Sequence, residues 1–509
     1  MDPNQPRNPK PNPKPNLKAK TKAKAKAAPK AHPARKPALT TDRRTLLKAA
    51  PLVPWFGANS SPARASEPSP QAIGPLQPKL PENGGDTAIL ALPEAFSYRV
   101  LQRAGDLMTD GYRVPALPDG MACIAVDDGH WALMRNHELE TRPYLRDPKR
   151  PPPELVYDAR YFGGVSRLLL DASNGTVVDS NLVLTGTARN CSSGPSPFGY
   201  LSCEEHTAPK HGYVFRCDPH ASTLQAPEPI RGYGRFRHEA VAVDPTTLIA
   251  YLTEDQADSC LYRFVPTRKE TPFVGRLEAL AVVGKPRTDT GPATTGTRFD
   301  IDWVPIAEPD PAQDTVRHQG FEQGAARIVR GEGIWLADGV VFFTATTGGP
   351  LGRGQLFALD IADSVLTVLA ASEDAATLNM PDNLTVSPTG LLVLAEDSPD
   401  PNHLRYIDGT GAPQPLARNE ISASEFAGPC FSPDGQTLFT NLQADGLTLA
   451  ITGPFSDLHN AAGFSPKSAM EGVPWAPPAG VIAGSAALSV LAFAAWARHR
   501  RGRGPKQAG

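Results

Sequence analysis

The chain has 509 residues, and its 51 Lys and Arg nearly balance 53 Asp and Glu. The charge is unevenly placed, because residues 66–497 hold 31 Lys and Arg against 51 Asp and Glu. This acidic part is a poor partner for nucleic acid, and it favours hard cations such as calcium.

The first 48 residues carry fourteen Lys and Arg and two Asp in a mixture rich in Pro, Ala and Lys. This composition has almost no large apolar side chains to bury, so it predicts a disordered basic N-terminus. The Lys and Ala alternation at residues 18–26 would also suit contact with nucleic acid or anionic lipid.

A twin-arginine pattern, Asp42-Arg43-Arg44-Thr45-Leu46-Leu47-Lys48, is followed by a weakly apolar stretch at residues 49–58 and by Ala63-Arg64-Ala65. Together these features predict a twin-arginine signal peptide within a leader at residues 1–65. We therefore expect the twin-arginine translocase as a partner during export, and an extracytoplasmic location. Because this route carries folded cargo, it also suggests a cofactor acquired before export.

Between about residues 90 and 460, short β-branched and aromatic runs alternate with Gly, Pro, Asn and Asp clusters. A pattern of strand, Pro-containing turn and second strand ending in an acid or amide recurs at residues 241–255, 384–397 and 430–441. Such repeats predict an all-β fold, a six-bladed β-propeller over residues 66–470. The polar ends of equivalent strands would then meet at one mouth of the central channel.

Potential ligands are dense in four segments, at residues 190–206, 234–239, 330–333 and 381–397. Carboxylates bind hard cations, and a thiolate beside them suits a ferric or other transition ion. For any single acidic pair, such as Glu254-Asp255, a turn or a solvated rim is the alternative, but recurrence at equivalent positions favours a shared site.

Two histidines and an arginine in these segments have open roles. His206 and His238 are candidate ligands or acid/base groups, with a structural hydrogen-bonded histidine as the alternative for each. The Arg330 guanidinium would suit an anionic substrate, because it binds phosphate oxygens in a bidentate fork, and an ion pair with a neighbouring carboxylate is its alternative.

Six cysteines, an even number, permit disulfides in an exported protein. If one cysteine binds metal, at least one other must remain unpaired.

The C-terminal part predicts a linker at residues 471–478, a transmembrane helix at 479–497 and a basic cytoplasmic tail at 498–509. The nineteen residues of the predicted helix carry no charge and are followed by Arg498, which fits a membrane span with a positive inner flank. The chain would then be anchored at the outer face of the cell membrane, and a buried core helix is the alternative.

Several of these motifs occur in the order found in one known family. They are Asn190-Cys191 to Cys203-Glu204-Glu205, residues 211–215, Gly234 to Glu239, residues 251–266, Gly331-Glu332-Gly333, Pro381-Asp382-Asn383 and residues 439–443. Over residues 130–455 the chain resembles the PhoX family of alkaline phosphatases.

The resemblance implies an extracytoplasmic hydrolase of phosphate monoesters, with ferric iron and calcium ions joined by a bridging oxo group in the propeller channel. It implies that Cys191 binds iron and that Arg330 holds the phosphate of a small phosphorylated substrate. The metal-binding acids that it implies are Glu205, Glu239, Glu254, Asp255, Glu332, Glu396 and Asp397.

This sequence departs from the family pattern in the loop after Cys191, which is one residue shorter, and in Ser193, Phe198 and Tyr200. These changes leave the ligands in place and affect the shape of the pocket. Two other functions remain as alternatives: a calcium propeller hydrolase of the lactonase type, and a non-catalytic anchored binding module. Cys191 separates them, because neither alternative has a use for a thiolate there.

Overall fold

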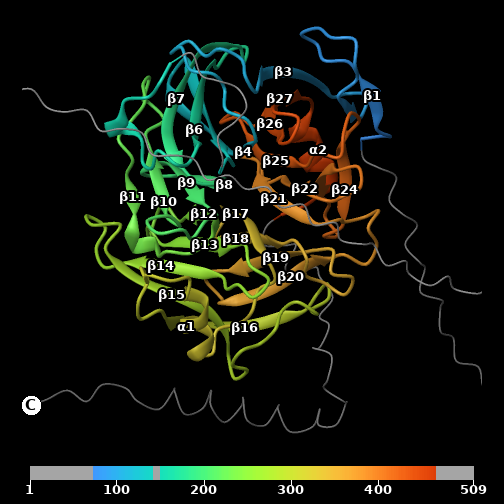
Figure 1. The fold of residues 1–509 in the computed structure, drawn as a ribbon. Coiled ribbons are helices and arrows are strands. Elements are labelled where there is room, and N and C mark those ends of the chain that lie inside the picture. Colours follow the sequence, from blue (N-terminus) through green and yellow to red (C-terminus); the bar gives the residue numbers. More distant parts are fainter. Residues whose placement is uncertain (1–72, 141–148, 466–509) are drawn as a thin grey trace, which may run out of the picture. The chain divides into compact units, whose positions relative to one another are not determined.

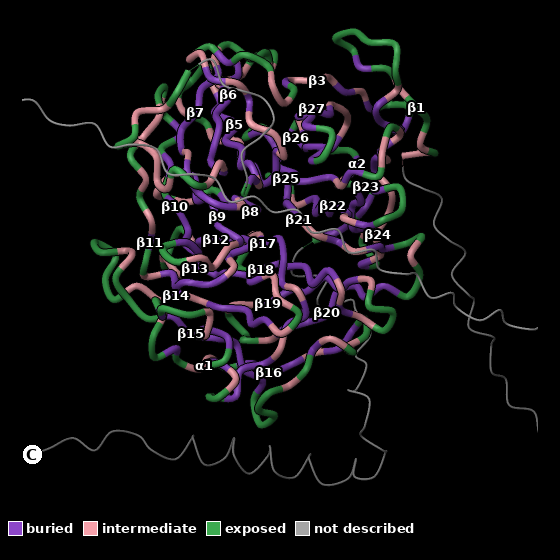
Figure 2. The backbone as a smooth tube through the Cα atoms, in the orientation of Figure 1, coloured by how far each residue is buried: buried purple, intermediate pink, exposed green. Residues whose placement is uncertain are grey.

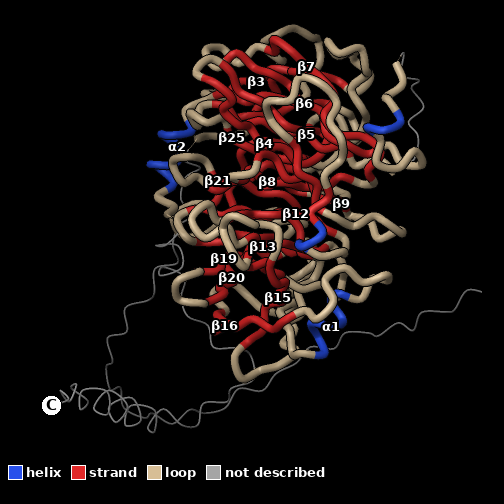
Figure 3. Tube along the Cα trace, turned by 90° about the vertical axis from the view of Figure 1, so that its left-hand side faces the viewer, coloured by secondary structure: helices blue, strands red, loops and turns tan. Residues whose placement is uncertain are grey.

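The computed structural model describes residues 73–140 and 149–465, and most of the regular structure there is β-strand. β-Branched and aromatic runs favour strands because these side chains pack well on a pleated surface. The described residues also contain helices α1 (Val316–Glu322) and α2 (Phe455–Ala462) and two 3-10 turns, Pro153–Leu155 and Arg231–Tyr233. Figure 3 shows the strands filling the interior and both α-helices at the edge. The all-β prediction is confirmed.

Three of the sheets have four strands each, and all their pairings are antiparallel. The first contains β4 (Pro118–Asp127), β5 (His130–His137), β6 (Gly163–Asp171) and β7 (Val177–Thr187). The second contains β8 (Asn190–Ser196), β9 (Gly199–Glu204), β10 (Val214–Cys217) and β11 (Pro229–Ile230). The third contains β25 (Phe426–Phe431), β26 (Thr437–Leu442), β27 (Leu447–Thr452) and β3 (Ser97–Arg103).

The other two sheets are larger. A six-stranded sheet contains β21 (Pro381–Val386), β22 (Leu392–Glu396), β23 (His403–Ile407), β24 (Pro413–Asn419), β2 (Leu90–Leu92) and β1 (Gln77–Lys79). A nine-stranded sheet contains β12 (His238–Val243), β13 (Ala250–Glu254), β14 (Tyr262–Pro266), β15 (Gly275–Val282), β16 (Arg298–Pro305), β20 (Val365–Ala371), β19 (Gln355–Asp360), β18 (Val340–Ala345) and β17 (Gly331–Ala337).

The prediction of six separate blades is wrong, because the described residues form five sheets. Strand β16 pairs with β15 on one side and with β20 on the other, which joins two groups of four strands into the nine-stranded sheet. The repeat in the sequence shows where strands turn, but it carries no information on which outer strand bonds to which.

The sheets are arranged around a centre (Figure 1). Strands β4, β8, β12, β17, β21 and β25 contact one another in that order, and β25 contacts β4 to complete the ring. We call these six the inner strands. Figure 2 shows that they run through buried parts of the fold.

Each sheet buries both of its faces against its neighbours, as β22 illustrates. Val393 and Ala395 pack in a cluster with residues of the β25–β27–β3 sheet, whereas Leu392 and Leu394 pack with Val340 and other residues of the nine-stranded sheet. Successive side chains of a strand point to opposite faces, so one apolar run serves two interfaces.

The predicted leader with its signal peptide, the linker, the C-terminal transmembrane helix and the tail all lie outside the described residues. Of the helices in residues 73–140 and 149–465, none combines the length and apolar character needed to cross a bilayer.

Candidate active site

Each inner strand has a shift in register close to its first residue. In β12, His238 pairs with Glu254, and the next pair is Val241 with Leu252. Equivalent shifts occur in the other five inner strands, between residues 118 and 121, 190 and 193, 331 and 334, 381 and 384, and 427 and 430. A β-bulge redirects the side chains within it. Five of the bulges contain a potential metal ligand at the same position: Asp119, Cys191, Glu239, Glu332 and Asp382.

These side chains belong to one continuous acidic cluster. Four groups of three residues bring their ligand atoms within 4.8 Å of one another: Asp119–Glu138–Cys191, Cys191–Glu205–Glu239, Glu239–Glu332–Asp382 and Asp382–Asp397–Glu425. Neighbouring groups share Cys191, Glu239 or Asp382, so the four form a chain of adjoining sites.

The remaining members of the cluster come mostly from the end of the second strand of a hairpin, that is, the strand that follows an inner strand in the chain. Glu138, Glu205 and Asp397 each follow the last residue of β5, β9 or β22. Asp255 follows β13 in the same way and adjoins the cluster, because its charge raises the pKa of Glu332 after the larger effect of burial. The centre therefore receives one residue from the bulge and one from the adjacent strand end in four of the inner hairpins.

At three of these four strand ends the preceding residue is also an acid, and it bonds to groups outside the cluster. Glu204 accepts hydrogen bonds from the amides of Ala188 and Gly212 at 2.9 Å, and Glu254 accepts one from the Tyr262 hydroxyl at 2.7 Å.

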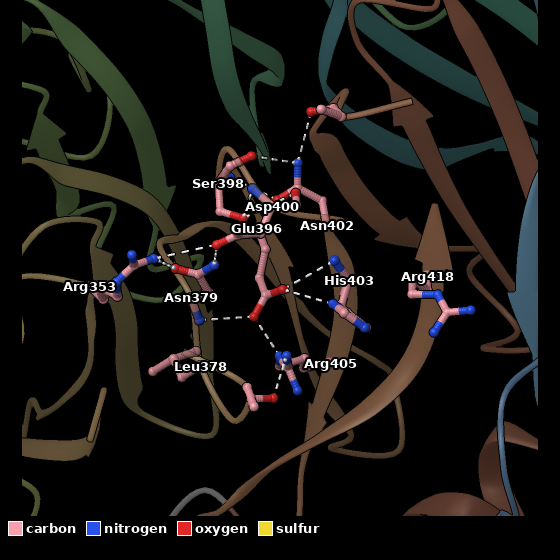
Figure 4. A network of polar contacts seen from close by, with 12 residues as sticks. Arg353, Leu378, Asn379, Glu396, Ser398, Asp400, Asn402, His403, Arg405 and Arg418 are labelled. Atoms are coloured by element: carbon pink, nitrogen blue, oxygen red, sulfur yellow. Dashed lines mark hydrogen bonds and ion pairs between the residues drawn. The ribbon is translucent and has the colours of Figure 1, made fainter. Parts of the chain in front are cut away.

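Glu396 lies in a similar network (Figure 4). Its carboxylate accepts hydrogen bonds from the amides of Asn379 at 3.0 Å and His403 at 3.1 Å and pairs with the buried Arg405 guanidinium. Alternation along the strand explains why Glu396 and Asp397 face different surroundings.

Side chains of second strands also fix the backbone of the bulges. The Asn136 amide donates to the carbonyl oxygen of Cys191 at 2.7 Å, and the Asn441 amide donates to that of Asp119 at 2.6 Å. Hydroxyl donors serve the carbonyls of two further bulges: Thr253 bonds to Glu332, and Thr344 bonds to Asp382. Each bond joins one hairpin to the next inner strand of the ring.

Burial is the main cause that raises the pKa of every ionisable group in the cluster. The pKa of Glu205 rises to about 7, and that of Asp382 also rises to about 7. Repulsion adds to burial, as in Glu239, whose pKa is raised further by the charges of Asp382 and Asp119. So many neighbouring carboxylates cannot all be ionised unless cations are bound. Without cations, some of them keep their protons.

Glu239 shows most directly that the cluster fits cations. It is 1 % exposed, and within the described residues neither of its carboxylate oxygens has a hydrogen-bond partner of normal geometry. The Cys191 thiol is near enough to offset part of the rise in its pKa. Since buried carboxylate oxygens are normally paired or bind metal, an oxygen-rich set with one sulfur is well suited to metal ions.

Two of the arginines that pair with acids of this region make close contacts with two carboxylates each. Arg330 makes a bidentate contact with Asp255, at 2.8 and 3.2 Å, and lies 2.8 Å from a carboxylate oxygen of Glu332. Arg189 bridges Glu138, at 2.5 Å, and Glu205. Their side chains are 30 % and 35 % exposed, so both arginines lie between the buried acids and the solvent.

The structure brings most of the predicted site residues together. Cys191, Glu205, Glu239, Glu332 and Asp397 belong to the acidic cluster, and Asp255 and Arg330 adjoin it. Glu254 and Glu396 are held in the separate networks described above.

Four members of the acidic cluster were not predicted as ligands: Asp119, Glu138, Asp382 and Glu425. Asp119 and Asp382 share a signal, because each follows the proline that begins an inner strand. Glu138 follows His137 at the end of β5, as Glu205 follows Glu204. Glu425 is placed by the fold alone, since its neighbours in sequence carry no repeated motif.

The two candidate histidines lie beside the cluster. His238 is buried, its Nε2 atom is 3.0 Å from the carbonyl oxygen of Gly234, and burial lowers its pKa to about 3. His238 therefore has the structural, hydrogen-bonded role that was the alternative to a ligand or acid/base group. His206 is half-buried and lies 3.3 Å from the Tyr161 hydroxyl. All six cysteines lie in the described residues and none forms a disulfide, so Cys191 is free to bind metal.

Comparisons with known proteins match both the sequence and the fold of the chain. The family model described as alkaline phosphatase PhoX matches residues 74–183 and 174–446. A solved structure of Pseudomonas fluorescens PhoX in complex with vanadate, a transition state analogue, is 18 % identical to this chain with a TM-score of 0.60. The match covers 75 % of this chain and 98 % of the Pseudomonas chain.

More distant similarities concern other enzymes. A Xanthomonas campestris gluconolactonase is 13 % identical with a TM-score of 0.41, and the match covers 75 % of this chain and 99 % of that one. A virginiamycin B lyase from Staphylococcus aureus is 11 % identical with a TM-score of 0.34, and the match covers 70 % and 99 %. No curated protein matches the sequence. On the family match, the chain belongs to the PhoX family of alkaline phosphatases, metal-dependent enzymes that hydrolyse phosphoric monoesters.

Proposed function

We propose that this phosphatase uses iron and calcium held by the acidic cluster, and that it acts outside the cytoplasm on small phosphate monoesters. The observation that carries the proposal is the chain of four adjoining ligand groups, of which two contain the Cys191 sulfur and two contain only carboxylate oxygens.

The donor atoms suggest how the metals would be divided. A thiolate with carboxylates suits a ferric ion, so Asp119, Glu138, Cys191, Glu205 and Glu239 would hold iron. The all-carboxylate groups suit calcium, which prefers several oxygen ligands, and they would use Glu239, Glu332, Asp382, Asp397 and Glu425. When bound, such cations neutralise the phosphate oxygens and the charge that develops on them.

Arg330 would hold the phosphate. With cations bound, the carboxylates of Asp255 and Glu332 would bind the metals in place of Arg330. The Arg330 guanidinium could then donate two parallel hydrogen bonds to phosphate oxygens. Its backbone helps to orient the side chain: Arg330 has a φ of 53°, a left-handed conformation that Leu117, Arg189 and Met380 share just before their own inner strands.

Export is proposed from the sequence alone. The twin-arginine pattern at residues 42–48 and Ala63-Arg64-Ala65 support passage through the twin-arginine translocase. A metal cluster with ligands from every part of the ring would require a folded chain, which agrees with export in the folded state.

The test is metal analysis of the purified protein together with hydrolysis of p-nitrophenyl phosphate, with and without a calcium chelator. We expect iron and calcium to be present and activity to fall when calcium is removed. Cys191→Ala should lose iron and lower kcat/KM by about 100-fold. Cys217→Ala, which removes a buried thiol from an outer strand, should keep its iron and its kcat/KM. A Cys191→Ala protein that retains iron and activity would overturn the iron assignment.

A further inference from the structure

Three arginines occupy equivalent places before three consecutive inner strands. Arg189, Arg237 and Arg330 each precede a potential ligand by two residues, in Arg189-Asn190-Cys191, Arg237-His238-Glu239 and Arg330-Gly331-Glu332. The bulges at these places are equivalent. The three guanidinium groups therefore belong to one side of the ring, where the acidic cluster lies.

The three arginines differ in how strongly the protein engages them. Arg330 and Arg189 each contact two carboxylates at hydrogen-bonding distance. Arg237 reaches a single carboxylate oxygen, Oε1 of Glu205, at 3.5 Å. Its Nε atom is buried without a hydrogen-bond partner among the described residues. Arg237 is thus the least engaged of the three, since its one carboxylate contact is long and its buried Nε is unpaired.

Arg237 lies on the solvent side of Glu205. The Glu205 side chain is 4 % exposed, whereas that of Arg237 is 38 % exposed. His206 directly follows Glu205 in the chain, and its side chain is half-buried. The His206 ring packs edge-on against Tyr161, with centroids 5.3 Å apart. Arg237 therefore lies at the solvent-facing edge of the cluster, where the leaving group of a bound phosphate ester would extend.

We infer that Arg237, with His206 and Tyr161 beside it, forms a subsite for the leaving group and selects phosphate monoesters that carry a second anionic group close to the ester. This inference rests on the proposed function of the cluster. Because Nε is buried, the two terminal nitrogens of the Arg237 guanidinium would donate the two parallel hydrogen bonds to a carboxylate or a second phosphate, and the aromatic rings would limit access of water to that contact.

The experiment compares two substrates that differ only in this group. The metal-loaded wild-type enzyme is assayed with 3-phosphoglycerate and with glycerol 3-phosphate, and the ratio of their kcat/KM values is the readout. 2-Phosphoglycolate and 2-hydroxyethyl phosphate provide the same comparison with the carboxylate one carbon closer to the ester. We expect the wild type to prefer the doubly anionic substrate of at least one pair by about tenfold, mainly through KM.

In Arg237→Gln this preference should fall to about one. Arg237→Lys, which keeps the charge but loses the bidentate geometry, should retain part of it and serves if the Gln variant does not fold. Arg268→Gln, which removes an exposed arginine from the loop after β14, is the matched control and should leave the ratio unchanged.

Two outcomes distinguish failure of the leaving-group subsite from failure of the proposed function. Hydrolysis of the esters with the same ratio in wild type and Arg237→Gln would overturn the leaving-group subsite and leave the phosphatase assignment intact. Failure of the metal-loaded wild type to hydrolyse any of these esters would overturn the proposed function and this inference with it.

Discussion

Of two adjacent acids at a strand end, one is a potential metal ligand and the other stabilises the fold. Asp397 contributes to the acidic cluster, whereas Glu396 stabilises the buried Arg405 and the amides of Asn379 and His403. Because strand side chains alternate between faces, a change of one position separates a potential ligand from a structural acid.

This division predicts different effects for two conservative substitutions. Glu396→Gln should lower the free energy of unfolding by about 2–4 kcal/mol, because it leaves the Arg405 charge buried without a carboxylate. Asp397→Asn should change stability little and lower kcat/KM for p-nitrophenyl phosphate by about tenfold, with more calcium needed for half-maximal activity. Denaturant unfolding and calcium titration of activity measure the two effects.

The two variants act as controls for each other. If folded Glu396→Gln protein lost calcium dependence while Asp397→Asn retained it, the assignment of the two acids would have to be exchanged.

At the scale of the element, the inner strands approach one another closely at their bulges. A Cβ atom on Gly333 of β17 would lie 2.7 Å from Cα of Asn383 and 2.9 Å from the carbonyl oxygen of Asp382 on β21. Gly120 of β4 makes an equally close approach to Ser192 on β8. Glycine lets the ligand-bearing backbones touch, which brings potential ligands of neighbouring strands within reach of shared cations.

Gly333→Ala should therefore separate β17 from β21. We expect a loss of about 1–3 kcal/mol in the free energy of unfolding, because backbone atoms cannot move aside as a flexible side chain would. Metal content should fall as well. Gly129→Ala is the matched control, since its Cβ would have no neighbour closer than the Asp127 carboxylate at 3.7 Å. Equal stability of the two variants in urea unfolding would contradict the close-approach argument.

At the scale of the whole molecule, the ring concentrates negative charge at its centre and closes with strands from both ends of the fold. Strand β3 pairs with β27, and the six-stranded sheet includes β1 and β2, so early and late parts of the chain share sheets. The cluster receives residues from Asp119 to Glu425, so it forms only when the ring is complete.

The charge at the centre predicts how the metal-free protein responds to pH. The pKa values of Glu205 and Asp382 rise in the fold to about 7 from ordinary values of 4.5 and 3.8. Between these values the folded state binds more protons than the unfolded state, so stability decreases as pH rises, by up to about 1.4 kcal/mol per pH unit for each proton. The melting temperature of the metal-free protein should therefore fall from pH 5 to pH 8.

Calcium should reverse this trend, because cations compete with protons for the same oxygens and bind the folded state. The rise in melting temperature on adding calcium should be larger at pH 8 than at pH 5. Asp382→Asn should reduce the pH dependence of the metal-free protein. A melting temperature that stays level or rises from pH 5 to pH 8 without metal would contradict the assignment of these carboxylates.

The sequence by itself determined the all-β class, the acids at the ends of repeated strands and the place of Cys191 ahead of a strand that ends in two acids, because these depend on local patterns of two to fifteen residues. Only the tertiary structure decided that five sheets form, that Asp119, Glu138, Asp382 and Glu425 join the cluster, and that Glu254 and Glu396 face their own sheets. The physical reason is that ligand identity depends on the direction of a side chain at a bulge and on contacts between strands up to about 300 residues apart, neither of which is encoded in a local pattern.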